Sequence, residues 1–167
     1  SKCKATRVGI KNKGKPFLWF LSLNAPHSPF NVPKEYYELY ENESELLESQ
    51  KRFYGMITNI DVNFGRLHQN VESLGIWDNT IIIFTTDNGT SNGYKYSKKD
   101  KKWLGFNAGM RGTKTSEYDG GHRVPFIIKW KKGGLCGGPS YSGLSAHVDM
   151  LPTFLSFAQI AFNSTNK

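Results

Sequence analysis

Residues 80–89 read TIIIFTTDNG, a run of β-branched and aromatic residues that ends abruptly in Asp87, Asn88 and Gly89. Such a run predicts a buried strand, because β-branched side chains pack well on a pleated surface. Polar residues directly after a buried strand are typical of a loop at the carboxyl edge of a parallel sheet, where ligands of α/β proteins bind. This stretch therefore predicts both a fold class and one part of a candidate site.

The segments on either side of this strand alternate in type. Residues 50–74 carry apolar side chains at every third or fourth position, which predicts a helix of about six or seven turns that Gly75 ends. Apolar runs at residues 16–24 and 124–130 predict two further strands, the first covered on both faces, and residues 149–161 predict a closing helix. This order indicates an α/β fold with a mainly parallel sheet flanked by helices.

Residues 90–121 form a long Gly- and Lys-rich stretch with little periodicity. A loop of this length without structure of its own is usually functional or disordered. The stretch lies between two predicted strands, so its polar residues are expected to lie near the candidate site to which Asp87 and Asn88 belong. Five lysines and one aspartate occupy residues 95–102.

Composition limits the classes of protein that the sequence fits. The chain has 167 residues, 22 Lys and Arg against 14 Asp and Glu, and a formal net charge of +8. This length predicts one domain or a piece of a larger one, and the hydrophobic share of 38% excludes a disordered tail. No apolar run approaches the roughly 20 residues that a membrane span needs. No nucleic-acid-binding motif accompanies the basic clusters, and solvated loops are their alternative explanation.

Asp87 and Asn88 offer one charged and one neutral oxygen donor, side by side. Hard oxygen donors suit Ca²⁺ or Mg²⁺ rather than zinc, and Gly89 lets the backbone turn tightly behind them. A plain Asp-Asn-Gly turn is the alternative interpretation of the tripeptide alone. Two ligands do not complete a calcium shell of about 6–8 oxygens, so further ligands must come from elsewhere.

Lys114 and His27 are the candidate groups for binding an anion. Lys114 lies in a glycine-flanked loop, where an ammonium stabilises an anionic ester oxygen. His27 stands between two prolines and is able to donate to an oxyanion or to act as an acid. Taken singly, a surface lysine and a loop histidine bonded to a carbonyl are the simpler interpretations.

The order of the motifs is more specific than any one of them. The chain contains NAPHSPFNVP at residues 24–33, then TDNG at 86–89, then RGTKTSEYDGGHRVP at 111–125, and AHVDMLPT at 146–153. From about residue 16 to residue 160 this series resembles the sulfatase family, whose members have alkaline-phosphatase-like α/β folds. The resemblance implies a partial alkaline-phosphatase-like sandwich. It divides the chain into a basic segment (1–15), a partial catalytic domain (16–161) and a short tail (162–167).

The resemblance also implies roles for single residues. Asp87 and Asn88 match the family's calcium ligands, which favours Ca²⁺ over Mg²⁺. Lys114 and His27 match residues that contact the sulfate group and act in catalysis. His122 and Arg123 match a segment with a mostly structural role. The family hydrolyses sulfate esters with a formylglycine made from Cys or Ser, whose hydrated aldehyde attacks sulfur.

The family's paired metal-binding aspartates and its nucleophile are not found before residue 16. Cys3 and Arg7 fit the formylglycine signal, but they lie close before His27 and lack the usual continuation, so we interpret the match as coincidence. We therefore expect the C-terminal portion of a sulfatase catalytic domain, inactive as an isolated chain. The formylglycine is expected in an upstream segment, and the sheet is expected to have an exposed edge.

The expected substrate is a sulfated small molecule or a sulfated polysaccharide, and the lysines of residues 95–102 favour a polyanion. No nucleic-acid partner and no membrane span are expected. Asn42 and Asn163 fit the glycosylation pattern, and the full-length parent is expected to be secreted, lysosomal or periplasmic, although no signal is visible in this chain. The sequence gives no support for a disulfide between Cys3 and Cys136.

Two alternatives stay open at this point. One is a phosphatase or phosphodiesterase of the same superfamily. The other is a non-catalytic pseudoenzyme that holds polyanions on a basic surface, independently of calcium and with steep salt dependence.

Overall fold

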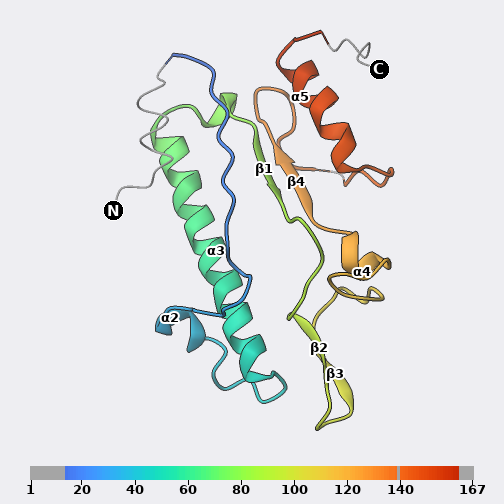
Figure 1. Cartoon of the computed structure of the whole chain (residues 1–167). Helices are drawn as coiled ribbons and strands as arrows, with labels where there is room; N and C mark the ends of the chain where they lie inside the picture. Colours follow the sequence, from blue (N-terminus) through green and yellow to red (C-terminus); the bar gives the residue numbers. More distant parts are fainter. Residues whose placement is uncertain (1–13, 139, 162–167) are drawn as a thin grey trace. The chain divides into compact units, whose positions relative to one another are not determined.

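The computed structural model describes residues 14–138 and 140–161 and divides the chain into two compact units, of which one ends at Cys136 and the other begins at Gly137. The first unit contains α2 (Lys34–Tyr37), α3 (Glu48–Ser73), the 3₁₀ turn η1 (Trp77–Asn79), β1 (Ile82–Thr85), β2 (Tyr94–Ser97), β3 (Lys102–Gly105), α4 (Asp119–His122) and β4 (Phe126–Lys129) (Figure 1). The second contains the 3₁₀ turn η2 (His147–Asp149) and α5 (Met150–Phe157).

The amphipathic periodicity correctly predicted α3, which has 26 residues. The helix ends as Gly75 predicts. Gly75 has φ +69°, and its N–H donates to the carbonyl of Glu72 at 2.8 Å. The N–H of Ile76 donates to the carbonyl of Val71 at 3.4 Å, which completes a Schellman motif. The end of the helix is therefore fixed by local sequence.

The apolar runs at residues 80–86 and 124–130 form β1 and β4, which confirms two of the predicted strands. The two strands pair antiparallel, with Ile82 opposite Lys129 and Thr85 opposite Phe126. β2 and β3 form a second antiparallel pair. The strands of the described residues thus form two-stranded antiparallel sheets. A mainly parallel sheet stays a prediction, because the described strand pairs are antiparallel and one segment that was expected to be a strand forms none.

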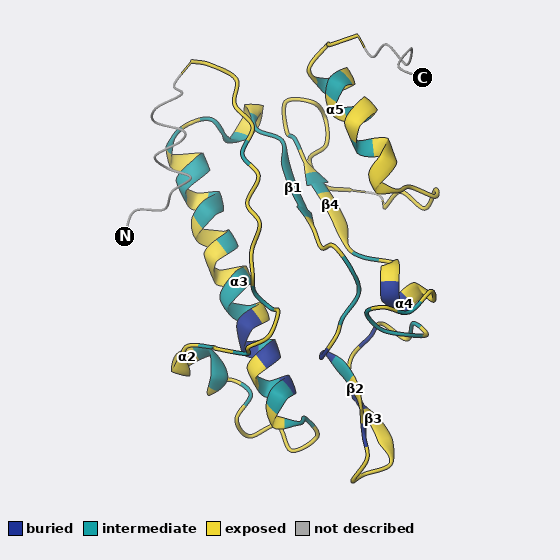
Figure 2. Ribbon diagram, viewed as in Figure 1, coloured by how far each residue is buried: buried dark blue, intermediate teal, exposed yellow. Residues whose placement is uncertain are grey.

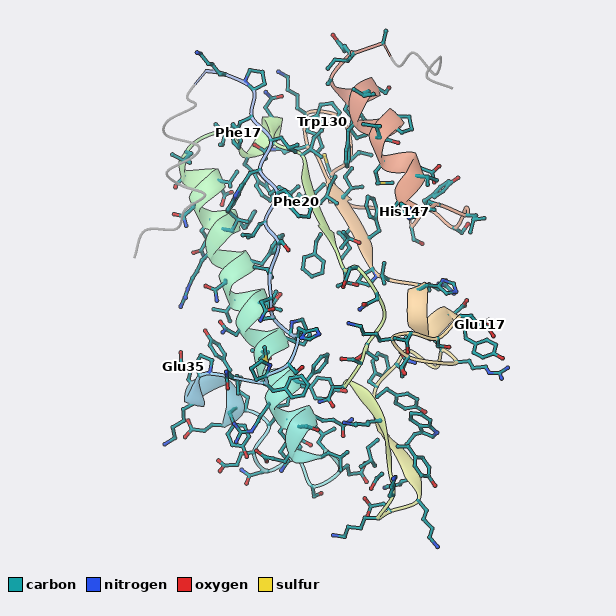
Figure 3. The ribbon with its side chains drawn as sticks, in the orientation of Figure 1. Phe17, Phe20, Glu35, Glu117, Trp130 and His147 are labelled. Atoms are coloured by element: carbon teal, nitrogen blue, oxygen red, sulfur yellow. The ribbon has the colours of Figure 1, made fainter. Side chains whose placement is uncertain are left out.

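That segment is residues 16–24, and the prediction of a buried strand there is wrong. The described residues form no β-ladder with it, and its side chains are largely exposed (Figure 2). Leu18 is 92% exposed and Phe20 is 85% exposed, and Figure 3 shows the side chains of Phe17 and Phe20. A strand exists only where a neighbour completes its hydrogen bonds, so an apolar run alone does not make one.

The buried residues of the first unit lie mainly on the N-terminal half of α3 and in the β2–β3 hairpin. The buried apolar side chains of the described residues are Phe53 and Met56 on α3 and Leu104 on β3 (Figure 2). Gln50 is fully buried, and its Nε2 donates to the carbonyl of Leu104 at 2.9 Å. Asn92, also buried, donates through Nδ2 to the carbonyl of Ser49 at 2.7 Å. Polar bonds therefore hold the base of the hairpin on the helix.

Residues 90–121 contain more structure than the sequence predicted. They include the β2–β3 hairpin and the short helix α4. The alternation of aromatic and polar residues in the hairpin strands YKYS and KWLG, around the tip KKDK, was the signal for a hairpin. The low overall hydrophobicity of this region concealed it.

In the second unit, α5 confirms the predicted closing helix over a shorter range, Met150–Phe157. The Asp149 carboxylate accepts a hydrogen bond from the N–H of Ala146 at 2.7 Å, and Thr153 donates through Oγ1 to the Asp149 carbonyl at 2.6 Å. Within the described ranges, no helix combines the length and hydrophobicity needed to span a bilayer.

Candidate functional site

The loop after β1 presents Asp87 and Asn88. Asp87 is exposed, and no hydrogen bond or ion pair from residues 14–138 or 140–161 engages its carboxylate. Asn88 donates through Nδ2 to the carbonyl of Gly89 at 3.2 Å, and its carbonyl accepts from Thr86 Oγ1 at 3.2 Å. These contacts hold the turn and leave the Asp87 carboxylate available for a ligand.

Two backbone hydrogen bonds join this loop to the loop that carries Lys114. The N–H of Gly89 donates to the carbonyl of Gly121 at 2.9 Å, and the N–H of Lys114 donates to the carbonyl of Thr90 at 2.8 Å. The two loops come from segments well separated in the sequence. The structure therefore brings the backbones of the predicted metal-binding loop and the predicted sulfate-binding loop into direct contact.

Glycine makes this contact close. A β-carbon at Gly89 would overlap the carbonyl oxygen of Gly120, and one at Gly120 would overlap the carbonyl oxygen of Gly112. Gly112 itself has φ +83°, a conformation in which other residues are strained. The N–H of Gly120 also donates to the carbonyl of Arg111 at 2.8 Å. The backbones of three glycines, Gly89, Gly112 and Gly120, are thus packed against one another where the two loops meet.

Asn107 holds the Lys114 loop through hydrogen bonds to its backbone, a role that sequence reasoning missed. It is 7% exposed, and its Nδ2 donates to the carbonyls of Met110 at 3.0 Å and Gly112 at 2.6 Å. A short polar side chain just before a run of glycines was the signal, since Asn often bonds to nearby backbone in turns. Its amide satisfies carbonyls that the tight loop leaves without partners.

The Lys114 ammonium has no hydrogen bond or ion pair to any residue that the structure describes. Lys114 is nevertheless half-buried. An ordinary surface lysine extends into water, where its charge is fully hydrated. An ammonium without a protein partner is a favourable place for an anion.

His27 is not joined to these loops. It is exposed, its Nδ1 lies 2.8 Å from the carbonyl oxygen of Ser28, and its N–H donates to the carbonyl of Asn24 at 2.9 Å. No ring contact or hydrogen bond connects it to Asp87, Asn88 or Lys114 in the described part of the chain. The structure therefore places His27 as a loop histidine bonded to a carbonyl.

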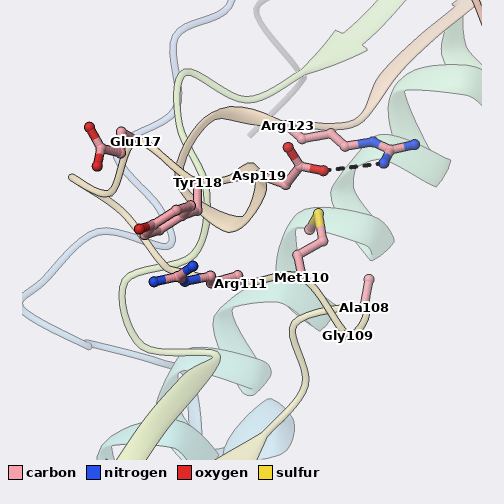
Figure 4. Close-up of a pocket in the computed structure, with 8 residues that line it drawn as sticks. All are labelled: Ala108, Gly109, Met110, Arg111, Glu117, Tyr118, Asp119 and Arg123. Atoms are coloured by element: carbon pink, nitrogen blue, oxygen red, sulfur yellow. Dashed lines mark ion pairs between the residues drawn. The ribbon is translucent and has the colours of Figure 1, made fainter.

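An open hollow of about 500 Å³ lies beside the Lys114 loop (Figure 4). The Arg111 guanidinium lies 3.6 Å from the centre of the Tyr118 ring, and Arg123 pairs with Asp119 at 3.5 Å. The second pair is exposed and contributes little to stability. The eight lining residues are Ala108, Gly109, Met110, Arg111, Glu117, Tyr118, Asp119 and Arg123.

His122 contacts backbone rather than the hollow, since its Nε2 lies 3.0 Å from the carbonyl oxygen of Glu117. Cys136 is exposed and its thiol is free among the described residues, and Cys3 and Arg7 lie outside them. Within the described ranges, no three His, Cys, Asp or Glu residues are grouped to hold a metal ion. Asp87 and Asn88 therefore supply at most part of a coordination shell.

Comparisons with known proteins agree on the family. The sequence profile of the sulfatase family matches residues 4–160. The uncharacterized sulfatase YdeN of Escherichia coli K12 is 31% identical over 160 residues, which cover 92% of this chain and 26% of YdeN. The ulvan-active sulfatase of Formosa agariphila is 27% identical over 159 residues, which cover 87% of this chain and 29% of that protein.

Among solved structures, Ps i-CgsB in complex with k-i-k-neocarrahexaose aligns with a TM-score of 0.79 and 29% identity, covering 96% of this chain and 33% of that one. This chain thus spans about a quarter to a third of the length of the proteins it matches. The match extends through both site loops, whose backbones the structure joins at Thr90 and Lys114. The chain belongs to the sulfatase family.

Proposed function

We propose that the full-length protein that carries this sequence hydrolyses sulfate esters, and that this chain supplies part of its calcium site and part of its sulfate-binding site. The observation that supports the proposal most is the pair of hydrogen bonds between the two loops, Gly89 to Gly121 and Lys114 to Thr90. They hold a free carboxylate and an unpaired ammonium on adjoining backbone. Family membership supports the same reaction class.

The residues present fit a calcium ion in the kind of donor they offer. Asp87 provides a carboxylate without a protein partner in the described chain, and the Oδ1 of Asn88 accepts no hydrogen bond there. Carboxylate and amide oxygens are the ligands that Ca²⁺ prefers, and the shell needs about 6–8 oxygens. We assign the remaining ligands to parts of the protein outside this chain. When bound, the ion neutralises charge on the ester's sulfuryl oxygens and helps to orient the ester.

Lys114 has the complementary task. Its ammonium binds a sulfuryl oxygen and offsets negative charge that would otherwise repel a nucleophile. In this proposal His27 donates a ring N–H to the same group. The nucleophile that we propose is a formylglycine.

We infer that the substrate is a sulfated carbohydrate. One matched sulfatase is ulvan-active, and Ps i-CgsB was solved in complex with k-i-k-neocarrahexaose. The basic residues 95–102 lie a few positions after the Asp87 loop. A polyanionic substrate gains from such a charge, whereas a small aryl ester gains little.

The direct test compares a sulfate ester and a phosphate ester of the same alcohol. The full-length protein is assayed with 4-nitrophenyl sulfate and 4-nitrophenyl phosphate, each with calcium and after removal of calcium by a chelator. We expect turnover of the sulfate ester to be the faster and to fall on chelation. Faster turnover of the phosphate ester would support the phosphatase alternative. Calcium-independent heparin binding without hydrolysis would support the pseudoenzyme alternative.

A further inference from the structure

The β2–β3 hairpin has two unlike faces. Tyr94 lies opposite Gly105 and Tyr96 lies opposite Trp103, so these side chains share one face. Lys95 lies opposite Leu104 on the other face, where Leu104 is 7% exposed. The aromatic side chains therefore lie on the face opposite to the buried Leu104 side chain.

The base of the hairpin is held firmly. Besides the Gln50 bond to Leu104, the Tyr54 hydroxyl donates to the carbonyl of Gly93 at 2.5 Å and accepts from the N–H of Phe106 at 3.0 Å. One residue of α3 thus holds both strands where they leave the body of the first unit. A rigidly held hairpin presents its outer face with little loss of conformational entropy on binding.

The aromatic face is partly open to solvent. The rings of Tyr94 and Trp103 stack with centroids 4.9 Å apart, and Tyr96 meets Trp103 edge to face at 5.7 Å. Tyr96 is 47% exposed and Trp103 is 53% exposed. These contacts fix the ring planes and leave ring surface uncovered. Exposed, ordered aromatic surface is suited to the apolar face of a sugar ring.

The tip of the hairpin adds positive charge. Lys98, Lys99 and Lys101 are all exposed, and the one acid there, Asp100, accepts a hydrogen bond from Ser97 Oγ at 2.6 Å. Lys101 has φ +53°, a conformation that glycine adopts more easily. A lysine at a position better suited to glycine adds a cation at a conformational cost.

Both ends of the hairpin continue into the candidate site. The Thr90 carbonyl accepts from the N–H of Lys114, while its Oγ1 accepts from the N–H of Gly93 at the start of the hairpin. On the other side, Asn107 follows β3 closely and bonds to the Gly112 carbonyl in the Lys114 loop. The hairpin is therefore continuous with both loops that we assign to sulfate ester binding.

We propose that the β2–β3 hairpin is a binding platform for a sulfated polysaccharide chain, with Tyr96 and Trp103 contacting sugar rings and the lysines at the tip contacting sulfate groups. This inference rests on the proposed sulfate ester hydrolysis and adds sites for sugars away from the cleaved ester. The lysines at the tip favour a ligand that carries anionic groups. A ligand that contacts both the Lys114 loop and the tip must also be extended, so a polymer with repeated anionic groups fits best. Single-stranded nucleic acid is also a polyanion with rings that stack on aromatic side chains, and the experiment below distinguishes it from a sulfated polysaccharide.

The experiment uses three variants of the full-length protein. One replaces the tip charges (Lys98→Ser, Lys99→Ser, Lys101→Gly) and leaves both strands untouched, since glycine suits the backbone at position 101. The second is Trp103→Leu, which keeps an apolar side chain in the pair. The matched control removes three exposed lysines elsewhere, with Lys15→Ser, Lys34→Ser and Lys132→Ser.

Desulfation of carrageenan and of 4-nitrophenyl sulfate is measured for each variant. For carrageenan we expect kcat/KM to fall about tenfold in the tip variant. The Trp103→Leu variant should lose about three- to tenfold, as loss of one aromatic contact predicts. The aryl sulfate should be hydrolysed as before by all variants. Equal loss on both substrates, or equal loss in the control, would overturn the platform.

Binding separates failure of this inference from failure of the proposed function. If the full-length protein hydrolyses no sulfate ester, its affinity for carrageenan and for chemically desulfated carrageenan is measured by calorimetry. Weaker binding of the desulfated polymer, reduced further by the tip substitutions, would support the platform without the hydrolysis. Tighter binding of a single-stranded RNA oligonucleotide than of carrageenan would overturn it.

Discussion

The backbone N–H of Lys114 donates a hydrogen bond of 2.8 Å to the carbonyl of Thr90, just beyond the loop that presents Asp87 and Asn88. This bond fixes the start of the Lys114 side chain relative to the loop of candidate metal ligands. The Gly89 bond to Gly121 fixes the same two segments at a second point. Two such constraints limit both sliding and rotation of one loop on the other.

Loss of the Lys114 charge should reduce catalysis. In the full-length protein, Lys114→Ala is expected to lower kcat/KM for 4-nitrophenyl sulfate at least tenfold, or about 1.4 kcal/mol of transition-state stabilisation. The reason is that the substitution removes the ammonium that we propose binds a sulfuryl oxygen. Lys34→Ala, an exposed lysine in α2, serves as the control and should keep its rate. An unchanged rate in Lys114→Ala would remove this residue from the site.

Asp87 should govern calcium affinity. Asp87→Asn keeps the size of the side chain and removes its charge, so calcium binding by the full-length protein should weaken about tenfold or more, as measured by calorimetry. Asp61→Asn, on an exposed part of α3, is the control and should bind calcium as the unchanged protein does. Equal calcium affinity in the two variants would show that Asp87 is not a ligand.

The close packing of glycine backbones between the two loops should not tolerate an added methyl group at Gly89. Gly89→Ala places a β-carbon against the Gly120 carbonyl, so we expect a loss of about 1–3 kcal/mol in the free energy of unfolding, measured with urea. Gly65→Ala is the matched control, because no heavy atom lies within 4 Å of its new β-carbon. Gly65 lies inside α3, so alanine there should stabilise the protein by about 0.5–1 kcal/mol. Similar changes in both variants would contradict the close packing.

Stability should fall at alkaline pH in a way that depends on Tyr54. Burial raises the pKa of the Tyr54 hydroxyl above its ordinary value of 10.0, against a smaller opposing effect of the Phe106 N–H. A raised pKa means that the folded state holds the proton more tightly than the unfolded state. The stabilisation is therefore complete below pH 10.0 and is lost as the pH rises through the pKa of the folded state.

The measurement is the free energy of unfolding of the full-length protein between about pH 9 and pH 12, a range set by the ordinary tyrosine pKa. Tyr54→Phe should reduce its decline with pH. Tyr141→Phe is the control, since Tyr141 is 81% exposed, and should leave the decline unchanged. Identical pH profiles of Tyr54→Phe and the unchanged protein would contradict the assignment.

Local sequence predicted those parts of the fold that local interactions determine. The repeat of apolar residues gave α3, and Gly75 gave its end, because both depend on neighbours within one or two turns. β1 and β4 followed from their β-branched residues. Residues 16–24 failed because a strand depends on a partner, which an apolar run does not specify. The β2–β3 hairpin was missed because its aromatic alternation lies in a region of low overall hydrophobicity, and the contacts of Gln50 and Tyr54 that hold it come from a distant helix.

In the candidate site, too, some features could be predicted from local sequence and others could not. The motifs around Asp87 and Lys114 were visible as sequence, and the structure places their loops in contact. His27 was grouped with them through the family resemblance, while the structure bonds it to its own loop. The supporting role of Asn107 was not predicted, since it depends on which carbonyls the folded loop leaves unpaired.

A double-mutant cycle between Asp87 and Lys114 tests most directly whether the two loops serve one site. The kcat/KM for 4-nitrophenyl sulfate is measured for the full-length protein, Asp87→Asn, Lys114→Ala and the double variant. Because both groups act on the same sulfate ester, we predict that the double variant departs from the sum of the single losses by at least about 1 kcal/mol. Losses that add to within about 0.3–0.5 kcal/mol, as independent positions give, would contradict a shared site.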